Sequence, residues 1–482
     1  MSSVVATGLK SGNKPDLLSI IHGFEGEVND AVFVTGQNSI LTASEDRSLR
    51  LWVMRDSGRY WPSVEKILPS PASLLVFDSL SRRICSGLDN GTISDFKLSD
   101  DLNCLNHTRD ILAHLGRITG IICVRELKLL LSTSRDKTVA WFNDATGEQL
   151  GSYNLDAPGT CLQFHVDSNC LFVGDSTGRI TLLGLAKGRD PPTFELIRQL
   201  HGHTGSVTSM SWDSLSSRLL SASIDQAVIM WDIGGGKGSA YELQGHSKAV
   251  SSVEWWYRPI LQKTTAVSDD SASRSPPVGR THTTLTVSAG LDGLVFFWFM
   301  DARRQETPTW GEADLCQLCS TPFFWNVRKM WTDKAVGVRQ HHCRRCGKAV
   351  CEKCSSHRSV YPVMGFERLV RICNDCFKAI ANEDLKSLAS SFDARHPISR
   401  IRILGDANLL LTIGKNKEVK VRAIKAIQTQ LPVFLINSYA LYLSVVPGVG
   451  SQKLPVISAS KLFSPSVLIL TLHRLLFFHS AT

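Results

Sequence analysis

The feature that most constrains this chain is a set of four cysteine pairs between residues 316 and 376. The pairs are Cys316 with Cys319, Cys343 with Cys346, Cys351 with Cys354, and Cys373 with Cys376. Two thiolates spaced two residues apart can bind one ion through a tight turn, and four thiolates complete a tetrahedral zinc site with Zn–S distances of about 2.3 Å. The eight cysteines therefore predict two closed, structural sites holding two Zn²⁺ ions.

The spacing of the pairs predicts how they share the ions. The gaps between successive pairs are 23, 4 and 18 residues. The four-residue gap is too short for the second and third pairs to wrap one ion comfortably, which favours interleaved pairing. We expect Cys316, Cys319, Cys351 and Cys354 at zinc 1, and Cys343, Cys346, Cys373 and Cys376 at zinc 2. Such binding can contribute about 10–16 kcal/mol to the folding of a module with a small apolar core.

A disulfide framework is the alternative use of paired cysteines. The first sixteen residues lack the basic segment and apolar run of a secretory signal peptide, so we expect a reducing compartment. The other five cysteines lack pair spacing and are expected to be small core residues: Cys85, Cys104, Cys123, Cys161 and Cys170. Both observations favour zinc.

A second feature is a pattern that recurs before the cysteine region. Each unit has an apolar run, a small polar turn and a period-2 stretch, and the units end at Trp52, Phe96, Phe142, Leu183, Trp231 and Trp298. The first five ends lie 44, 46, 41 and 48 residues apart. The alternation predicts strands, and a repeat of this length is typical of one four-stranded propeller blade.

These units resemble WD repeats, whose blades contain a buried His, Ser, Asp and Trp network. Two units carry the full set: His203, Ser221, Asp225 and Trp231, then His246, Ser288, Asp292 and Trp298. An acid–base catalytic role is the alternative, but one enzyme does not need several copies of its active site. We expect structural networks, since leaving a buried polar group unpaired costs about 1–3 kcal/mol.

The fold class expected is mainly β: a seven-bladed WD-repeat β-propeller, with a small two-zinc finger at 310–380 inserted between blades 6 and 7. Residues 15–305 would form blades 1–6, and 395–422 a degenerate seventh blade. Residues 17–21 are expected to add the outermost strand and close the ring, which removes an open sheet edge.

Three further segments fall outside this repeat pattern. Residues 258–283 are rich in Ser, Thr and Pro and are expected to be a disordered insertion. Residues 377–391 have apolar side chains at helical spacing, which predicts a helix. Residues 423–482 form an atypical tail with apolar runs of 14 and 17 residues, shorter than the about 20 that a membrane span needs.

The cysteine region is strongly basic. Residues 310–380 contain 12 Lys and Arg against 6 Asp and Glu, so +6 of the chain's net +9 lies there. This charge indicates an anionic partner, either nucleic acid or a lipid headgroup. The series of stacking aromatic residues expected of a nucleic-acid site is missing, so we expect no nucleic acid.

The residues around the second cysteine pair distinguish this finger from others of its kind. Residues 339–347 read R-Q-H-H-C-R-R-C-G and residues 371–373 read R-I-C. These motifs resemble the FYVE signature, whereas a RING finger would usually include a His ligand. Over residues 15–422, the chain resembles the WD-repeat and FYVE domain-containing proteins of early endosomes.

This resemblance implies binding of phosphatidylinositol 3-phosphate. The headgroup contacts it implies are Arg339, His341, His342, Arg344 and Arg371, and the membrane-inserting residues are Val336 and Val338. Two departures from the family pattern bear on lipid affinity: Gln340 stands where a second basic residue is usual, and Asp314 is displaced by one residue.

The function expected is that of a non-enzymatic adaptor, cytosolic and peripherally associated with early endosomes. The finger would bind phosphatidylinositol 3-phosphate and the propeller would hold unidentified protein partners. No Gly-rich phosphate loop, nucleophile elbow or paired-carboxylate site is evident. The alternative is a RING-like E3 ubiquitin ligase whose WD-repeat propeller binds substrates.

Overall fold

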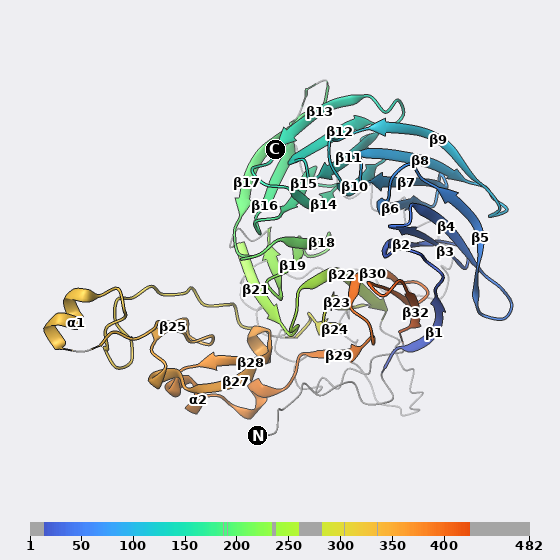
Figure 1. Ribbon diagram of the computed structural model, residues 1–482. Helices are drawn as coiled ribbons and strands as arrows, with labels where there is room; N and C mark the ends of the chain where they lie inside the picture. The colour runs from blue at the N-terminus through green and yellow to red at the C-terminus, as the bar shows by residue number, and fades with distance from the viewer. Residues whose placement is uncertain are drawn as a thin grey trace, which may run out of the picture. The chain divides into compact units, whose positions relative to one another are not determined.

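The computed structural model describes residues 14–424, except 187, 190, 234–237, 260–281, 303 and 335. Seven antiparallel sheets are arranged in a ring, as Figure 1 shows. This confirms the seven-bladed propeller. The predicted tail lies outside the described residues from 425 onward, and no helix of the described part is long and apolar enough to cross a membrane.

Each blade runs from an innermost strand at the centre of the ring to an outermost strand at its rim. In that order, blade 1 contains β2 (Val28–Val34), β3 (Ser39–Ser44), β4 (Ser48–Met54) and β5 (Tyr60–Ile67). Blade 2 contains β6 (Ala72–Asp78), β7 (Arg83–Leu88), β8 (Thr92–Leu98) and β9 (Leu105–Leu112). Blade 3 contains β10 (Ile118–Val124), β11 (Leu129–Ser134), β12 (Thr138–Asn143) and β13 (Gln149–Asn154). Blade 4 contains β14 (Gly159–His165), β15 (Cys170–Asp175), β16 (Ile180–Leu185) and β17 (Phe194–Leu200). Blade 5 contains β18 (Val207–Asp213), β19 (Arg218–Ser223), β20 (Ala227–Asp232) and β21 (Gly238–Gln244).

The last two blades each contain one strand from a distant part of the sequence. Blade 6 contains β22 (Val250–Pro259), β23 (His282–Gly290), β24 (Leu294–Phe299) and β29 (Ala389–Asp393). Blade 7 contains β30 (Ile398–Leu404), β31 (Leu409–Gly414), β32 (Val419–Ala423) and β1 (Asp16–Ile21). The finger therefore precedes the seventh repeat in sequence, as expected, and in space its connections enter and leave blade 6 between β24 and β29.

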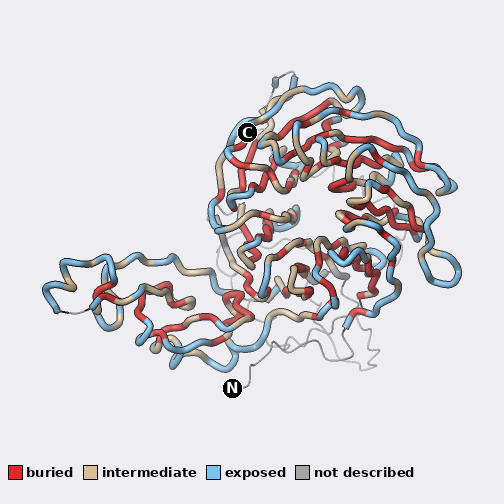
Figure 2. Tube along the Cα trace, in the orientation of Figure 1, coloured by how far each residue is buried: buried red, intermediate tan, exposed pale blue. Residues whose placement is uncertain are grey.

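Burial follows strand position within each blade. The second strands β3 and β11 are buried along their whole length, whereas the outermost β5 is mostly exposed (Figure 2). A continuous run of apolar and small residues suits a strand that neighbouring sheets cover on both faces. The core is therefore a series of clusters between adjacent blades rather than one central mass.

The ring closes through the N-terminal strand, as predicted. β1 pairs antiparallel with β32, with Asp16 opposite Ala423 and Ile21 opposite Val419. A second link joins blades 7 and 1, because the fully buried carboxylate of Asp30 accepts hydrogen bonds from Arg400 at 2.7 Å and from Arg402 at 3.0 Å. β1 therefore covers the outer edge of β32.

The two predicted His-containing sets each come together inside a blade. His203 Nδ1 lies 2.9 Å from the Asp225 carboxylate and its Nε2 lies 2.7 Å from Ser221 Oγ, which also accepts from Trp231 Nε1 at 2.8 Å. The second set repeats this geometry, with distances of 3.1, 2.9 and 2.9 Å among His246, Asp292, Ser288 and Trp298. Every ring nitrogen is thereby occupied within the blade core.

The finger contains short elements only. They are α1 (Val327–Asp333), β25 (His341–His342), β26 (Ala349–Val350), β27 (His357–Tyr361), β28 (Phe366–Ile372) and α2 (Asn374–Lys378), with 3₁₀ turns at Lys353–Ser355, Pro362–Met364 and Asn382–Leu385. β28 pairs in parallel with β21, so the β27–β28 hairpin continues the sheet of blade 5.

The predicted helix over 377–391 is wrong. α2 ends at Lys378, a 3₁₀ turn follows, and residues 389–393 form β29. β29 supplies the fourth strand of blade 6 by pairing with β24, for example Phe392 with Val295. Without β29, the outer edge of β24 would be unpaired, and each unpaired backbone group there would cost free energy. This cost outweighs the weak helical spacing of residues 377–391.

The insertion predicted at 258–283 is shorter than expected. β22 and β23 extend into it, with Arg258 opposite Thr283 and Pro259 opposite His282. Residues 260–281 lie outside the described part of the chain.

Candidate metal centres and basic pocket

The eight finger cysteines form two clusters with the predicted membership. Cys316, Cys319, Cys351 and Cys354 make one cluster, and Cys343, Cys346, Cys373 and Cys376 the other, with all sulfurs of a cluster within 4.8 Å of one another. A tetrahedron with 2.3 Å Zn–S bonds has sulfurs about 3.8 Å apart. The separations of 3.6 Å from Cys319 to Cys351 and 4.0 Å from Cys346 to Cys373 fit such an ion.

Backbone groups support a thiolate in each cluster in the same way. The Cys351 N–H donates to Cys316 Sγ at 3.3 Å, and the Cys373 N–H donates to Cys343 Sγ at 3.3 Å. A hydrogen bond to the charged form of a group stabilises that form. The donor sets therefore suit zinc in both charge and spacing.

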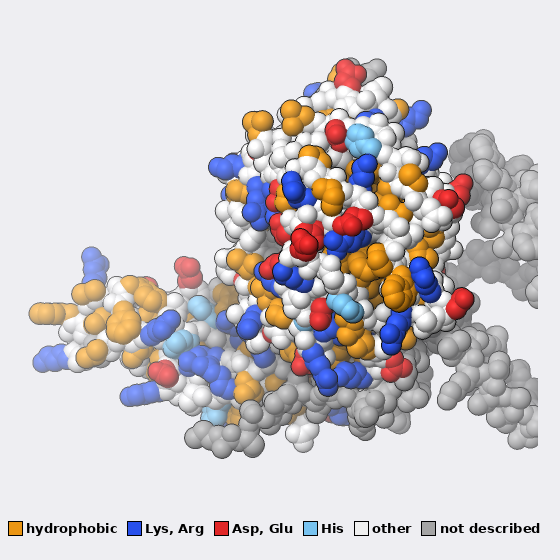
Figure 3. All heavy atoms as spheres, turned by 45° about the vertical axis from the view of Figure 1, so that its right-hand side comes forward, with side chains coloured by type: hydrophobic (Ala, Val, Ile, Leu, Met, Phe, Trp, Pro, Cys, Tyr) orange, Lys and Arg blue, Asp and Glu red, His pale blue; other side chains and the backbone are white. Residues whose placement is uncertain are grey.

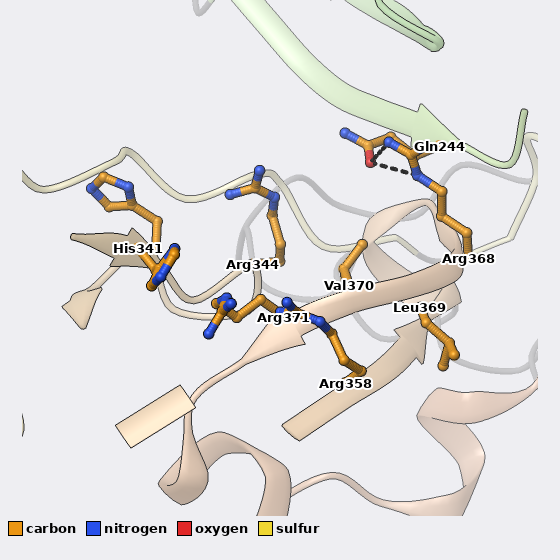
Figure 4. Close-up of a pocket in the computed structure, with 9 residues that line it drawn as sticks. Gln244, His341, Arg344, Arg358, Arg368, Leu369, Val370 and Arg371 are labelled. Carbon is orange, nitrogen blue, oxygen red and sulfur yellow. Dashed lines mark hydrogen bonds between the residues drawn. The ribbon is translucent and has the colours of Figure 1, made fainter. Parts of the chain in front are cut away.

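A basic pocket of about 520 Å³ lies beside the clusters, shown in Figure 4. Six of its nine lining residues are Arg or His and none is acidic: Gln244, His341, His342, Arg344, Arg358, Arg368, Leu369, Val370 and Arg371. His341 and His342 form β25, whereas Arg368 to Arg371 lie on β28. Four of the five predicted headgroup residues thus share one pocket.

Trp310 supports two of these side chains. The Arg344 guanidinium stacks over its ring, 4.0 Å from the centroid, and His342 meets the ring edge-on at 5.2 Å between centroids. His342 Nε2 also lies 3.1 Å from the Gly311 carbonyl oxygen. Stacking on an aromatic ring orients a guanidinium without neutralising it.

The β27–β28 hairpin brings two further charges together. Arg358 lies directly opposite Arg371 in the antiparallel register. Arg371 Nη1 donates to the carbonyl oxygen of Ser355 at 2.9 Å and to its hydroxyl at 3.1 Å, and its own carbonyl accepts from Arg344 N–H at 3.0 Å. These neutral partners fix Arg371 without a direct ion pair, and Glu352 is the acidic group that acts on its charge from a longer distance.

The pocket is electrostatically unbalanced. Among the described residues, no carboxylate oxygen lies within 4.0 Å of a pocket arginine. Burial lowers the pKa of Arg344, and the nearby charges of Arg368 and Arg358 lower it further. The charge of Glu242 opposes this shift. Burial and the charge of Arg371 likewise lower the pKa of His341. An anion in the pocket would relieve this mutual repulsion.

Arg339 is the predicted headgroup residue that the pocket does not include. It is exposed. Burial and the charge of Arg371 lower the pKa of His341 more than Arg339 does, and burial and Arg358 likewise lower the pKa of Arg371 more than Arg339 does. Sequence reasoning missed Arg358, Arg368 and Gln244. A hairpin prediction around Gly365 could have found Arg358, whereas no sequence signal points to Gln244 in blade 5.

Asp314 and Gln340 lie in a separate pocket of about 460 Å³ with Glu312, Ala313 and Trp325. The Asp314 carboxylate accepts a hydrogen bond from Trp325 Nε1 at 3.0 Å. The displaced aspartate is therefore engaged within the finger and does not line the basic pocket.

The two predicted membrane-inserting residues differ in placement. Val336 is 82% exposed. Val338 is half-buried and packs against the finger core, with its backbone bonded to Pro322 and Phe324. The Val338 side chain thus packs inward, unlike that of Val336, and its insertion into a membrane stays a prediction.

Other exposed apolar residues accompany Val336. We call this set the apolar tip: Phe324, Trp325, Val327, Trp331 and Val336. Trp331, on α1, is 86% exposed. Figure 3 shows hydrophobic side chains gathered at the end of the finger, with Lys and Arg side chains beside them. An exposed apolar patch with a basic rim is typical of an interaction surface.

Comparisons with known proteins agree with this architecture. A family model described as the FYVE zinc finger matches residues 309–382, and one described as WD domain, G-beta repeat, matches residues 16–53 and 194–232. With the matched finger and the two four-cysteine clusters, the chain carries two zinc ions.

Relatives match along most of the chain. WD repeat and FYVE domain-containing protein 1 of Mus musculus is 41% identical over 85% of this chain and 93% of its own length. Protein 2 of Homo sapiens is 43% identical over 85% and 95%, and protein 2 of Caenorhabditis elegans 35% identical over 86% and 94%. The crystal structure of the WD40 β-propeller domain of Doa1 matches with a TM-score of 0.51, covering 86% of this chain and 98% of that one. At 13% identity, this is a likeness in fold alone.

Proposed function

The chain belongs to the family of WD repeat and FYVE domain-containing proteins, and from that premise we propose that it is a non-enzymatic adaptor for membranes bearing phosphatidylinositol 3-phosphate. The finger binds the lipid headgroup, and the propeller holds protein partners. The protein is then a peripheral component of early endosomes.

The observation that carries this proposal is the excess of positive charge in the basic pocket. Arg344, Arg358, Arg368 and Arg371 converge there without a carboxylate partner among the described residues. A phosphate monoester offers several anionic oxygens to such donors, and charge-assisted hydrogen bonds to them are short and strong. The pocket therefore suits a headgroup carrying a free phosphate.

The proposed headgroup contacts within the pocket are Arg344, Arg371, His341 and His342, with Arg339 acting at its margin. Trp310 and Ser355 hold the two arginines in place through neutral contacts. When bound, the zinc ions hold together the cysteine-bearing turns that flank β25 and β28. The eight clustered cysteines are accordingly the proposed ligands.

The apolar tip is the proposed membrane contact. Val336 and Trp331 are almost fully exposed, and Arg328, Lys329 and Lys334 lie beside them on or next to α1. Tryptophan favours the interface between lipid headgroups and acyl chains, and basic residues favour anionic membrane surfaces. Headgroup binding and a small apolar patch are each weak, so together they provide the anchoring.

The test is binding to liposomes that carry different phosphoinositides. The wild type should pellet with vesicles containing phosphatidylinositol 3-phosphate and much less with the 4-phosphate isomer. Arg344→Ala should abolish pelleting, while Arg189→Ala, an exposed propeller arginine paired with Glu195, should not. Zinc content confirms that each variant has a folded finger. Equal binding of wild type and Arg344→Ala would overturn the proposal.

A further inference from the structure

We propose that the propeller is part of the headgroup site: Gln244 of blade 5 holds Arg368 through a neutral contact, which keeps the arginine's charge available to the lipid phosphate. This inference rests on the proposed function and deepens it. Gln244 is then a positioning residue supplied by a different domain from the finger.

Arg368 is fixed entirely by the propeller. Its Nε and Nη2 atoms donate to Gln244 Oε1 at 3.2 and 2.9 Å, the contacts dashed in Figure 4. Its Nη1 atom donates to Gln226 Oε1 at 2.7 Å and to the His246 carbonyl oxygen at 3.3 Å. Gln244 and Arg368 both line the basic pocket.

All of these acceptors are neutral amide oxygens. Other arginines of the propeller are paired with buried carboxylates instead. Arg83 and Arg109 share Asp95 at 2.6 and 2.8 Å, and Arg400 and Arg402 share Asp30. A carboxylate beside Arg368 would compete with a phosphate for the same guanidinium, whereas an amide oxygen orients it and leaves the charge.

The backbone of Gln244 fixes the same junction. Its N–H donates to the Gly365 carbonyl oxygen at 2.9 Å, and Gln244 forms a parallel bridge with the fully buried Phe366. Gly365 has φ 93°, and a Cβ there would lie 2.3 Å from the Glu242 carbonyl oxygen. Strand β28, which carries both Arg368 and Arg371, is therefore placed directly against β21.

The decisive variant is Gln244→Glu in the full-length protein. A carboxylate at this position keeps an acceptor for Arg368 but cancels its charge. The change also removes the hydrogen bond that Gln244 Nε2 donates to the Glu242 carboxylate, so stability has to be measured alongside binding. If Arg368 serves the anion, affinity for soluble inositol 1,3-bisphosphate and for phosphatidylinositol 3-phosphate vesicles should fall about tenfold, with zinc content equal to that of the wild type. If Arg368 only docks the finger, binding should stay the same or become tighter, which would overturn the inference.

Gln149→Glu is the matched control, because it makes the same charge change on the exposed outer strand of blade 3. Loss of affinity in both variants to the same extent would contradict the inference by indicating a nonspecific charge effect. Arg368→Lys should bind better than Arg368→Ala, since it keeps the charge. Should Gln244→Glu melt at a lower temperature, Gln226→Glu repeats the test from outside the pocket, and unchanged binding in that variant would overturn the inference.

Arg344→Ala is measured in parallel to separate the two proposals. If Arg344→Ala binds like the wild type, the proposed function fails. If Arg344→Ala loses binding while Gln244→Glu keeps it, only the role of the propeller fails. Comparing soluble headgroup with vesicles shows whether the effect lies at the phosphate or at the membrane.

Discussion

Arg358 and Arg371 are cross-strand partners in the β27–β28 hairpin, and both line the basic pocket. Like charges directly opposite each other destabilise a sheet. The finger tolerates the pair because the zinc clusters hold the surrounding turns, and a bound anion would offset the repulsion. If the pocket binds the proposed headgroup, this pair lowers the stability of the free protein and raises its affinity for the anion.

We therefore expect opposite effects from Arg358→Ala. Relief of the repulsion should stabilise the finger slightly, by at most about 0.5 kcal/mol at this exposed position, while headgroup affinity falls several-fold. Zinc release on heating, followed with a chromogenic chelator, reports the first effect, and titration with soluble inositol 1,3-bisphosphate the second. Lys353→Ala, an exposed cation outside the pocket, is the control. Unchanged affinity in Arg358→Ala would contradict this interpretation.

Trp331→Ala should separate membrane retention from headgroup binding. Trp331 lies on α1 and does not line the basic pocket. Retention on phosphatidylinositol 3-phosphate vesicles should fall about thirtyfold, since full burial of a large apolar side chain contributes about 2 kcal/mol. Affinity for the soluble headgroup should stay unchanged. Trp61→Ala, which removes a half-exposed tryptophan from blade 1, should alter neither. Full retention of Trp331→Ala would exclude the apolar tip as a membrane contact.

Removal of zinc should destroy the finger and spare the propeller. None of the eight clustered cysteines lies in a propeller strand. After chelation, lipid binding should be lost while most of the β-sheet circular dichroism and the cooperative melt remain, because the blades have their own core clusters. Adding zinc back should restore binding. Lipid binding that persists after metal analysis shows no zinc would contradict this prediction.

Ring closure can be tested at β1. Ile21 is 2% exposed and packs with Val419 and Val421 of blade 7, whereas Ile20 is 40% exposed. Ile21→Ala should lower the free energy of unfolding by about 2–4 kcal/mol, and Ile20→Ala by about 0.5 kcal/mol or less. Denaturant titration compares the two. Equal small effects would mean that β1 adds little to closure.

Local spacing explains what the sequence could predict. Cysteine pairs two residues apart define a turn by themselves, and repeats of blade length define strands, so the clusters and the ring followed from short-range patterns. Arg368 contacts Gln244 across 124 residues of sequence, and no local pattern encodes that contact. Residues 389–393 differ from the predicted helix for a related reason, since pairing with the distant strand β24 decides their conformation.

His396 in blade 7 should make stability depend on pH. Its Nε2 lies 3.0 Å from Thr412 Oγ1 and its Nδ1 3.2 Å from Asn416 Oδ1. Burial, followed by the positive charges of Lys420 and Arg422, lowers its pKa to about 4, although Asn416 and Glu418 oppose this. The folded protein therefore keeps the imidazole neutral where the unfolded chain would protonate it.

The direction of this pH dependence follows from proton binding. An unfolded histidine has a pKa of about 6.5, so between pH 6.5 and 4 the unfolded state binds a proton that the folded state does not. Stability is fully present above pH 6.5 and should fall by about 2 kcal/mol between pH 7.5 and 5 from this group alone. Urea unfolding at pH 7.5 and 5 should show a smaller loss of stability for His396→Asn than for the wild type. His201→Asn, at an exposed position, should lose as much stability as the wild type. If His396→Asn loses as much stability as the wild type, the pH dependence arises elsewhere in the chain.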